Sequence, residues 1–209
     1  MPSQLPSQFS STANIQSTRK ALRLQIRQAR RSLSDEQQLA CSQLAAKHTL
    51  EALISRKVKC VALYLSNDGE LDTQPLIDGL WQNGVDVYLP RLHPFSAGNL
   101  LFLRYDKGTQ LLKNHLGIWE PKLDITQMIL THQLDVVITP LVAFDLQGNR
   151  MGMGGGYYDR SLSNWQQQHR PLPIGYAHDC QQVEALPCEH WDVPLPFIFT
   201  PSHCYSFEQ

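Results

Sequence analysis

The stretch LDVVITPLVAF, residues 134–144, decides the fold class of this chain. It is a nearly continuous apolar run that is rich in β-branched residues. Strands that are covered on both faces have this composition, as in a parallel sheet with helices on each side. We therefore expect a buried central strand over residues 134–144.

Segments on both sides of this stretch alternate between strand and helix patterns. We expect strands over residues 57–66, 85–92, 100–105, 172–177 and 196–200, and helices over residues 18–33, 34–54, 72–84 and 158–168. The second helix begins with a capping-box pattern, in which Ser34 precedes Gln37 by one helical turn. The alternation predicts an α/β chain with a three-layer αβα architecture. Its sheet would be mostly parallel, with an N-terminal helical extension.

The length of 209 residues fits one domain, which we place at residues 18–209. Residues 1–17 are rich in Ser, Gln and Pro and lack the apolar core of a secretory signal, so we interpret them as a disordered tail. The formal net charge of -1 gives no global attraction to nucleic acid or acidic lipid, and no apolar run approaches the roughly 18 residues of a membrane span. Five scattered cysteines without a Cys-x-x-Cys pair favour a reducing compartment, so the expected location is cytoplasmic.

A glycine-rich segment, GNRMGMGGGYYDR at residues 148–160, contains five of the 12 glycines of the chain. It follows the buried strand and precedes an expected helix, which is where ligands bind in open α/β sheets. Glycine lets a phosphate or a flat ring approach the backbone, and a helix start offers unpaired N–H groups. No Lys-Ser or Lys-Thr follows, so the segment is not a P-loop. From the glycines alone, phosphate binding and a flexible loop or hairpin bulge are about equally supported.

The residues that flank these glycines favour a ligand site. Arg150 and Arg160 supply cations suited to phosphate, and Asp159 is suited to a hard metal ion. Tyr157 and Tyr158 could stack on a heterocycle or pack the following helix onto the sheet. We expect one of the two tyrosines to have only the packing role.

Several segments, in order along the chain, resemble the 5-formyltetrahydrofolate cyclo-ligase family, whose members are also called 5,10-methenyltetrahydrofolate synthetases. The glycine segment is similar to the family signature R-x-G-x-G-x-G-Y-Y-D, and a basic helix start appears as Lys20, Leu22 and Arg23. The segments YLSNDGELDT, LGIWEP and DVVITPLVAFD match further family segments. The resemblance extends from about Arg19 to Thr200.

The resemblance implies a Rossmann-like sheet of the CoA transferase-like type, and an enzyme that closes a ring in 5-formyltetrahydrofolate. The formyl oxygen would be phosphorylated by ATP, N10 would close the ring, and 5,10-methenyltetrahydrofolate, ADP and phosphate would be released. ATP would be a co-substrate and Mg²⁺ the cofactor, and the partners would be small molecules, with neither a membrane nor nucleic acid expected. A non-catalytic protein of the same fold that binds nucleotide, folate or RNA remains the alternative.

The resemblance also implies roles for individual residues. Arg150 and Tyr157 are the expected catalytic residues, and Asp159 and Asp192 are the expected Mg²⁺ ligands. The expected ATP-binding residues are Arg19, Lys20, Arg23, Arg150, Gly152, Gly154, Gly155, Gly156, Tyr157 and Tyr158. The expected folate-binding residues are Leu65, Glu70, Trp119, Met153, Gly154, Gly155, Gly156 and Tyr157.

Some of these assignments have alternatives. Arg19 stands as an alternative to Lys20, because the register of the basic helix can shift by one residue, and without the resemblance this helix indicates a solvated basic face or a weak RNA contact. The Glu70 carboxylate is suited to accept hydrogen bonds from the N–H edge of a pterin. Trp119 could equally be a core residue.

Two positions depart from the family pattern. Pro196 stands where a second aspartate often follows Asp192, so this strand end is expected to contact ligands differently. Gly155 stands where some relatives carry Lys, which removes one phosphate cation that Arg160 could replace.

Overall fold

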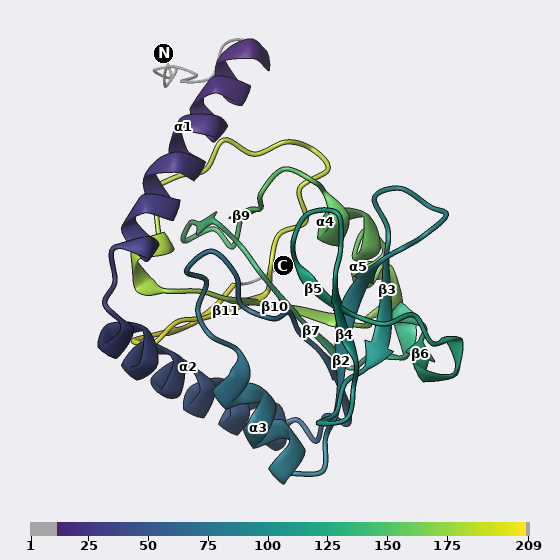
Figure 1. Cartoon of the computed structure of the whole chain (residues 1–209). Coiled ribbons are helices and arrows are strands. Elements are labelled where there is room, and N and C mark those ends of the chain that lie inside the picture. The colour runs from purple at the N-terminus through teal and green to yellow at the C-terminus, as the bar shows by residue number, and fades with distance from the viewer. Residues whose placement is uncertain (1–11, 208–209) are drawn as a thin grey trace.

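The computed structural model describes residues 12–207, and an eight-stranded sheet forms its centre (Figure 1). In spatial order the strands are β12 (Cys204–Ser206), β11 (Phe197–Phe199), β10 (Leu172–Tyr176), β7 (Val136–Thr139), β1 (Cys60–Ala62), β2 (Asp86–Leu92), β3 (Leu100–Arg104) and β6 (Met128–Ile129). The strands from β11 to β2 pair in parallel, whereas β12, β3 and β6 pair antiparallel at the two edges. The predicted mostly parallel sheet is confirmed.

The central strand β7 shows why both faces of the sheet are covered. All of its residues are buried. Val136 and Ile138 belong to one core cluster, while Val137 belongs to a second cluster that also contains Leu162. Successive residues of a strand point to opposite faces, so an apolar residue at every position supplies two cores.

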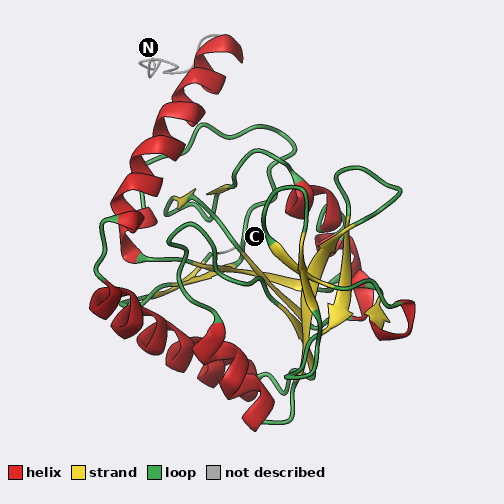
Figure 2. Cartoon of the chain, in the orientation of Figure 1, coloured by secondary structure: helices red, strands yellow, loops and turns green. Residues whose placement is uncertain are grey.

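Helices cover the two faces of the sheet separately (Figure 2). α2 (Asp35–Ser55) and α3 (Gln74–Gln82) pack on one face, and the short helices α4 (Tyr157–Ser161) and α5 (Trp165–Gln168) pack on the other. The predicted capping box of α2 is present, because the Gln37 N–H donates to Ser34 Oγ at 3.2 Å and the Ser34 N–H donates to Gln37 Oε1 at 2.9 Å. The 3-10 turns are η1 (Ile125–Gln127), η2 (Thr131–Gln133) and η3 (Asp179–Gln181).

The first helix, α1 (Thr12–Arg31), is the predicted N-terminal extension and runs past one end of the sheet (Figure 1). It begins earlier than residue 18, so the last residues of the stretch interpreted as a tail are helical. The rest of that stretch, residues 1–11, lies outside the described residues.

The prediction of one strand over residues 134–144 is wrong in its second half. β7 ends at Thr139 because Pro140 has no N–H to donate to a sheet ladder. β8 (Ala143–Phe144) instead pairs antiparallel with β9 (Arg150–Met151), so the chain folds back and delivers the glycine segment beside the carboxyl end of β7.

The prediction of one helix over residues 158–168 is also wrong. α4 ends at Ser161 with Leu162 as its C-cap, and the poor helix formers Ser163 and Asn164 then precede α5. A hairpin of β4 (Leu111–Lys113) and β5 (Trp119–Pro121) was not predicted, and it forms a separate two-stranded sheet.

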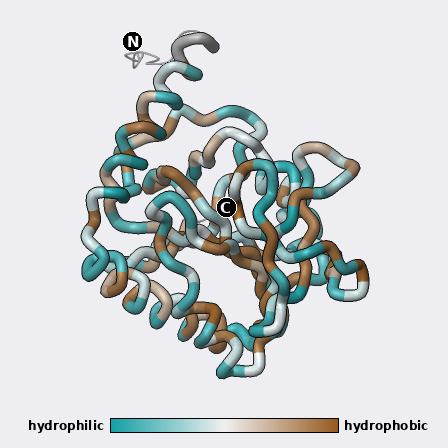
Figure 3. Tube along the Cα trace, viewed as in Figure 1, coloured by the Kyte–Doolittle hydropathy of each residue, from teal (hydrophilic) through white to brown (hydrophobic). Residues whose placement is uncertain are grey.

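Hydropathy follows this layered arrangement. Figure 3 shows hydrophobic segments along the interior of the sheet and hydrophilic segments at many outer turns. Within residues 12–207, no helix has both the length and the apolar character required to span a bilayer.

Candidate active site

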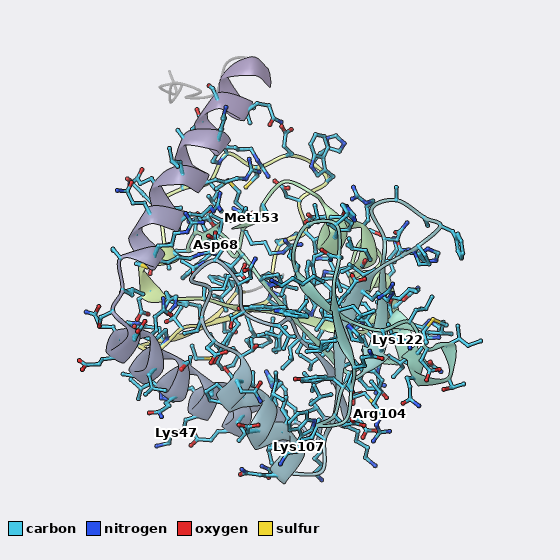
Figure 4. The ribbon with its side chains drawn as sticks, in the orientation of Figure 1. Lys47, Asp68, Arg104, Lys107, Lys122 and Met153 are labelled. Carbon is cyan, nitrogen blue, oxygen red and sulfur yellow. The ribbon has the colours of Figure 1, made fainter. Side chains whose placement is uncertain are left out.

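A cavity of about 1000 Å³ opens at the carboxyl ends of the parallel strands. Leu65 lines it beyond β1, and Pro140 lines it beyond β7. α1, the glycine segment and the β4–β5 hairpin supply the remaining walls. Figure 4 labels Asp68 and Met153, two of its lining residues, beside α1. Ligands of open α/β sheets bind at this edge of the strands.

The structure gathers the predicted site residues around this cavity, with one exception. The lining residues among them are Arg19, Arg23, Leu65, Glu70, Trp119, Arg150, Gly152, Met153, Gly154, Gly155, Gly156, Tyr157, Tyr158, Asp159 and Asp192. Lys20 is exposed and does not line the cavity. The structure therefore brings Arg19 and Arg23, one helical turn apart, to the site in place of Lys20.

The glycines of the loop serve different purposes. Gly154 and Gly156 have φ angles of 102° and 65°, in the left-handed region that favours glycine. At Gly155 a Cβ would lie 2.7 Å from the Tyr157 ring, so this glycine makes room for the tyrosine. At Gly152 a Cβ would have only the Arg150 guanidinium near it, at 4.0 Å, so here bare backbone faces open space in the cavity wall.

The helix that follows the loop is too short to supply the anion attraction expected of a helix start. α4 has five residues, and its N-cap Gly156 makes no side-chain cap. The dipole of so short a helix is small. Positive charge at this end of the cavity must come from arginine side chains.

Arg160 does not provide that charge, because it does not line the cavity. Its Nε donates to the Gly98 carbonyl at 2.8 Å, its Nη2 donates to the Gly155 carbonyl, and its guanidinium lies 5.7 Å from the centroid of the Tyr157 ring. Arg160 therefore fixes the loop and does not replace a phosphate-binding lysine at Gly155.

Arg150 and Asp159 form a buried ion pair at the cavity wall. Arg150 Nη2 donates to Asp159 Oδ1 at 2.7 Å, and the Val193 N–H donates to the same oxygen at 3.2 Å. Burial lowers the pKa of Arg150, and the neighbouring Asp159 and Asp192 carboxylates oppose that shift. Arg150 Nε has no hydrogen-bond partner within the described residues.

Arg19 and Asp192 form the second ion pair. Arg19 Nη1 donates to Asp192 Oδ2 at 2.7 Å and to the Pro187 carbonyl at 2.7 Å, while Nη2 donates to Asp192 Oδ1 at 3.2 Å. The two ion pairs are neighbours, because Asp192 directly precedes Val193, whose N–H binds Asp159.

The two carboxylates are compatible with Mg²⁺ that arrives with a nucleotide. No group of three or more His, Cys, Asp or Glu side chains within residues 12–207 is arranged to hold a metal by itself. Mg²⁺ bound to nucleotides commonly takes one or two carboxylates and completes its shell with water and phosphate oxygens. Asp159 and Asp192 are neighbouring carboxylates on the cavity wall and fit that requirement.

Arg23 differs from its neighbours on α1. Its Nε donates to the Gly152 carbonyl at 2.8 Å, and its Nη2 lies 3.5 Å from the position of a Cβ at Gly154. Within residues 12–207 no ion pair engages Arg23. Its guanidinium therefore lies against the glycine loop with no carboxylate bound to it.

The other end of the cavity contains a junction that the sequence did not predict. Asp68 accepts hydrogen bonds from Arg27 Nε at 2.6 Å, from Arg30 Nη2 at 3.0 Å and from Arg31. Asp68 and Gly69 have φ angles of 55° and 72°, so the segment that carries this carboxylate is also a tight turn. All five α1 arginines line the cavity, so the interpretation of this helix as a separate solvated basic face is wrong.

Glu70 and Trp119 also line the cavity, and Glu70 Oε1 lies 3.9 Å from Arg30 Nη1 of this junction. Burial raises the pKa of Glu70, and Arg30 and the Asn67 N–H, which donates to Glu70 Oε2 at 3.1 Å, oppose that shift. Trp119 is half exposed on β5, with the Lys113 ammonium 5.0 Å from its ring centroid. The interpretation of Trp119 as a core residue is wrong.

Two further positions singled out in the sequence are Tyr158 and Pro196. Tyr158 packs with Leu162 in the core beside α4, and burial raises the pKa of its hydroxyl, so it is the tyrosine with the packing role. Pro196 does not line the cavity, and its carbonyl accepts the Phe207 N–H at 2.9 Å. The departure at Pro196 therefore does not alter the cavity wall.

Residues 15–201 match the 5-formyltetrahydrofolate cyclo-ligase family. The chain belongs to this family. The predicted family, and with it an enzyme in place of a non-catalytic binding protein, is confirmed.

Relatives from distant organisms carry the cyclo-ligase name. The chain is 56% identical over 182 residues to 5-formyltetrahydrofolate cyclo-ligase of Escherichia coli strain K12, an alignment that covers 87% of this chain and 100% of that protein. It is 30% identical over 201 residues to the Saccharomyces cerevisiae protein of the same name, covering 87% of this chain and 94% of that protein.

Solved cyclo-ligase structures have the same fold. The NMR structure of Aquifex aeolicus 5,10-methenyltetrahydrofolate synthetase superposes with a TM-score of 0.77 at 28% identity, covering 91% of this chain and 93% of that chain. A Mycoplasma pneumoniae 5,10-methenyltetrahydrofolate synthetase gives 0.70 at 25% identity, covering 88% and 98%.

Proposed function

We propose that this chain converts 5-formyltetrahydrofolate to 5,10-methenyltetrahydrofolate in a reaction that requires ATP and Mg²⁺ and releases ADP and phosphate. The names of the relatives support the folate reaction. One feature of the cavity carries the nucleotide requirement: Arg23 lies on the glycine loop without a carboxylate partner within residues 12–207, beside Asp159 and Asp192.

This arrangement suits a triphosphate. A guanidinium without a bound carboxylate is a ready partner for phosphate oxygens. The open backbone at Gly152 allows close approach, since no Cβ occupies the space in front of it. Mg²⁺ held by Asp159 and Asp192 would neutralise phosphate charge.

The proposed chemistry has two steps. A formamide oxygen is a poor leaving group, so it first attacks the γ-phosphorus of ATP, and ADP departs. N10 then attacks the activated formyl carbon and releases its proton to solvent, the ring closes, and the bond from that carbon to the phosphorylated oxygen breaks to release phosphate. Phosphoryl transfer of this kind depends on positioning and charge neutralisation more than on covalent catalysis by the protein.

The residues of the cavity would divide this work. Arg150, held by Asp159, places a buried cation near the transferred phosphoryl group. Tyr157 packs on the reduced pterin, and Glu70 and Trp119 hold the folate at the opposite end. Arg19 keeps Asp192 at the cavity wall. The partners are thus small molecules, and a cytoplasmic location stays a prediction.

A spectrophotometric assay tests the proposal. Purified protein is mixed with 5-formyltetrahydrofolate, ATP and Mg²⁺, and formation of the near-ultraviolet absorbance of the methenyl product is recorded while ADP is quantified in parallel. We expect one ADP per methenyl product and no product when ATP is omitted or Mg²⁺ is chelated. Binding of folate and nucleotide without product would instead identify a non-catalytic binding protein.

A further inference from the structure

We propose that Arg30 is a substrate-positioning residue whose Nη1, together with the Glu70 carboxylate, binds the lactam edge of the pterin ring. The assignment rests on the proposed function, because it specifies which part of the folate this end of the cavity holds. In the sequence, Arg30 stands out only as part of a basic helix face.

The guanidinium of Arg30 is fixed in place by two of its three nitrogens. Arg30 has no exposed surface, although it lines the cavity wall. Its Nε donates to the Asp68 carbonyl at 2.9 Å, and its Nη2 donates to Asp68 Oδ2 at 3.0 Å. The planar geometry of the group then fixes the direction of the third nitrogen, Nη1.

Nη1 has no hydrogen-bond partner within residues 12–207, although it is buried. A buried charged donor without an acceptor is costly, and such groups in folded proteins call for an explanation. Its neighbour is Glu70, whose Oε1 lies 3.9 Å away, beyond hydrogen-bond distance.

Glu70 offers the complementary half of the pair. Its Oε2 accepts from the Asn67 N–H at 3.1 Å, while no hydrogen bond within the described residues engages Oε1. In the cavity wall this N–H donor and this carboxylate oxygen therefore lie 3.9 Å apart as a loose ion pair, and neither makes a hydrogen bond within the described residues. This pair matches a ring lactam, which presents a carbonyl acceptor next to an N–H donor.

The pterin of a folate carries such an edge. The 4-oxo group would accept from Arg30 Nη1, and N3–H together with the neighbouring 2-amino group would donate to Glu70. Arg23, which contacts the glycine loop, lies one helical turn before Arg27 of the Asp68 junction, so we place the phosphates beside Arg23 and the ring beside Glu70. An adenine edge also offers an acceptor beside a donor, so nucleotide binding is one readout of the test.

The experiment compares two probes, folic acid and its 4-amino-4-deoxy analogue, by calorimetric titration of the full chain. The analogue replaces the acceptor at position 4 with a donor, which conflicts with Arg30 Nη1. We expect the wild-type protein to bind folic acid about 10- to 100-fold more tightly than the analogue. The analogue also has no hydrogen on N3 and so loses a contact with Glu70. In Arg30→Met the preference should therefore fall about three- to tenfold and keep the part that Glu70 supplies.

Two further variants keep the test independent of folding defects. Arg31→Met removes another arginine from Asp68 but leaves Arg30 Nη1 in place, so it should retain the preference. Glu70→Gln removes the charged acceptor and should weaken folic acid binding even if Arg30→Met does not fold. Equal weakening of both probes in Arg30→Met, an unchanged preference, or a loss of ATP binding in place of folate binding would each overturn the assignment.

The binding test and the activity assay can fail independently of each other. If the wild-type protein makes no methenyl product but shows the 4-oxo preference, and this preference falls in Arg30→Met, the catalytic proposal is wrong while the pterin contact stands. If product forms but the preference is absent, the pterin contact is wrong and the activity stands.

Discussion

The two ends of the cavity both set α1 arginines against a loop that carries carboxylates, yet they are built differently. At the Asp68 end, one carboxylate binds Arg27, Arg30 and Arg31. At the glycine-loop end, Asp159 and Asp192 have one arginine each, and Arg23 has no carboxylate partner within residues 12–207. The arginines of α1 therefore hold the Asp68 loop in place at one end, and at the other end they leave one cation available to bind a ligand.

The largest effect is expected at Asp159, a carboxylate at the glycine-loop end that has a single arginine partner and that we expect to bind Mg²⁺. Asp159→Asn keeps the shape of the side chain and an oxygen for the Val193 N–H, but it removes the charge that would hold Mg²⁺. We expect kcat to fall by about 100-fold or more, the scale of losing one electrostatic contact to a transition state. Methenyl product formation at saturating substrates measures it.

Asp78→Asn is the matched control, because Asp78 is exposed on α3 and does not line the cavity. It should turn over like the wild-type protein. Far-ultraviolet circular dichroism establishes that the Asp159→Asn variant is folded. A folded variant with near-normal kcat would show that the metal ligand is placed wrongly.

A second, smaller effect is expected at Arg23. Arg23→Met keeps the aliphatic part of the side chain and removes the guanidinium that has no carboxylate partner within the described part of the chain. Losing a charged hydrogen bond to phosphate should raise the dissociation constant for Mg·ATP by about 10-fold or more and leave folic acid binding within about twofold. Lys20→Met, three positions away on an exposed face, should change neither constant. Equal effects of the two substitutions would remove the distinction between the two ends.

Tyr157 directly follows the glycine loop and should affect the binding of the two ligands unequally. Its ring covers Gly155 at the cavity wall and has the Arg160 guanidinium near it. Tyr157→Ala removes a face on which a pterin can stack, so folic acid binding should weaken about three- to tenfold, and ATP binding should weaken less. Parallel titrations with the two ligands decide the point, and a larger loss for ATP would count against the assignment.

The sequence predicted the parts of this molecule that depend on local pattern. The apolar run before Pro140 indicated the buried parallel strand, Ser34 and Gln37 indicated the capping box, and the spaced glycines after Arg150 located one end of the cavity. Each of these signals is contained in a short segment, so no knowledge of distant contacts was needed.

The parts that were missed depend on contacts between distant segments. Asp68 meets arginines that lie 37 to 41 positions earlier in the chain, and no local pattern distinguishes it from an ordinary turn residue. Arg30 is buried because that turn closes over α1, whereas its sequence neighbours predict a solvated face. Lys20 and Arg19 differ only by helical register, which the packing of α1 decides.

At the Asp68 end we expect the smallest effect on activity, together with an effect on the free energy of unfolding. His178 is 1% exposed, and both of its ring nitrogens lack hydrogen-bond partners within residues 12–207. Burial, and secondarily Arg30, lowers the pKa of His178 to about 4, with Asp179 opposing. The unfolded chain takes up this proton near pH 6.5, so the contribution of His178 to stability is lost as the pH falls from about 6.5 to about 4.

Replacing His178 should remove that part of the pH dependence. The wild-type protein should lose of the order of 3 kcal/mol of unfolding free energy through this residue between pH 7 and pH 4, given its pKa of about 4. In His178→Leu, urea unfolding at the two pH values should show a difference smaller by about that amount, while turnover at pH 7 stays within about twofold. The Asp68 end would thus be sensitive to acid through a neutral histidine packed near Arg30. An identical pH dependence in both proteins would mean that His178 is protonated, or reaches water, in the folded state.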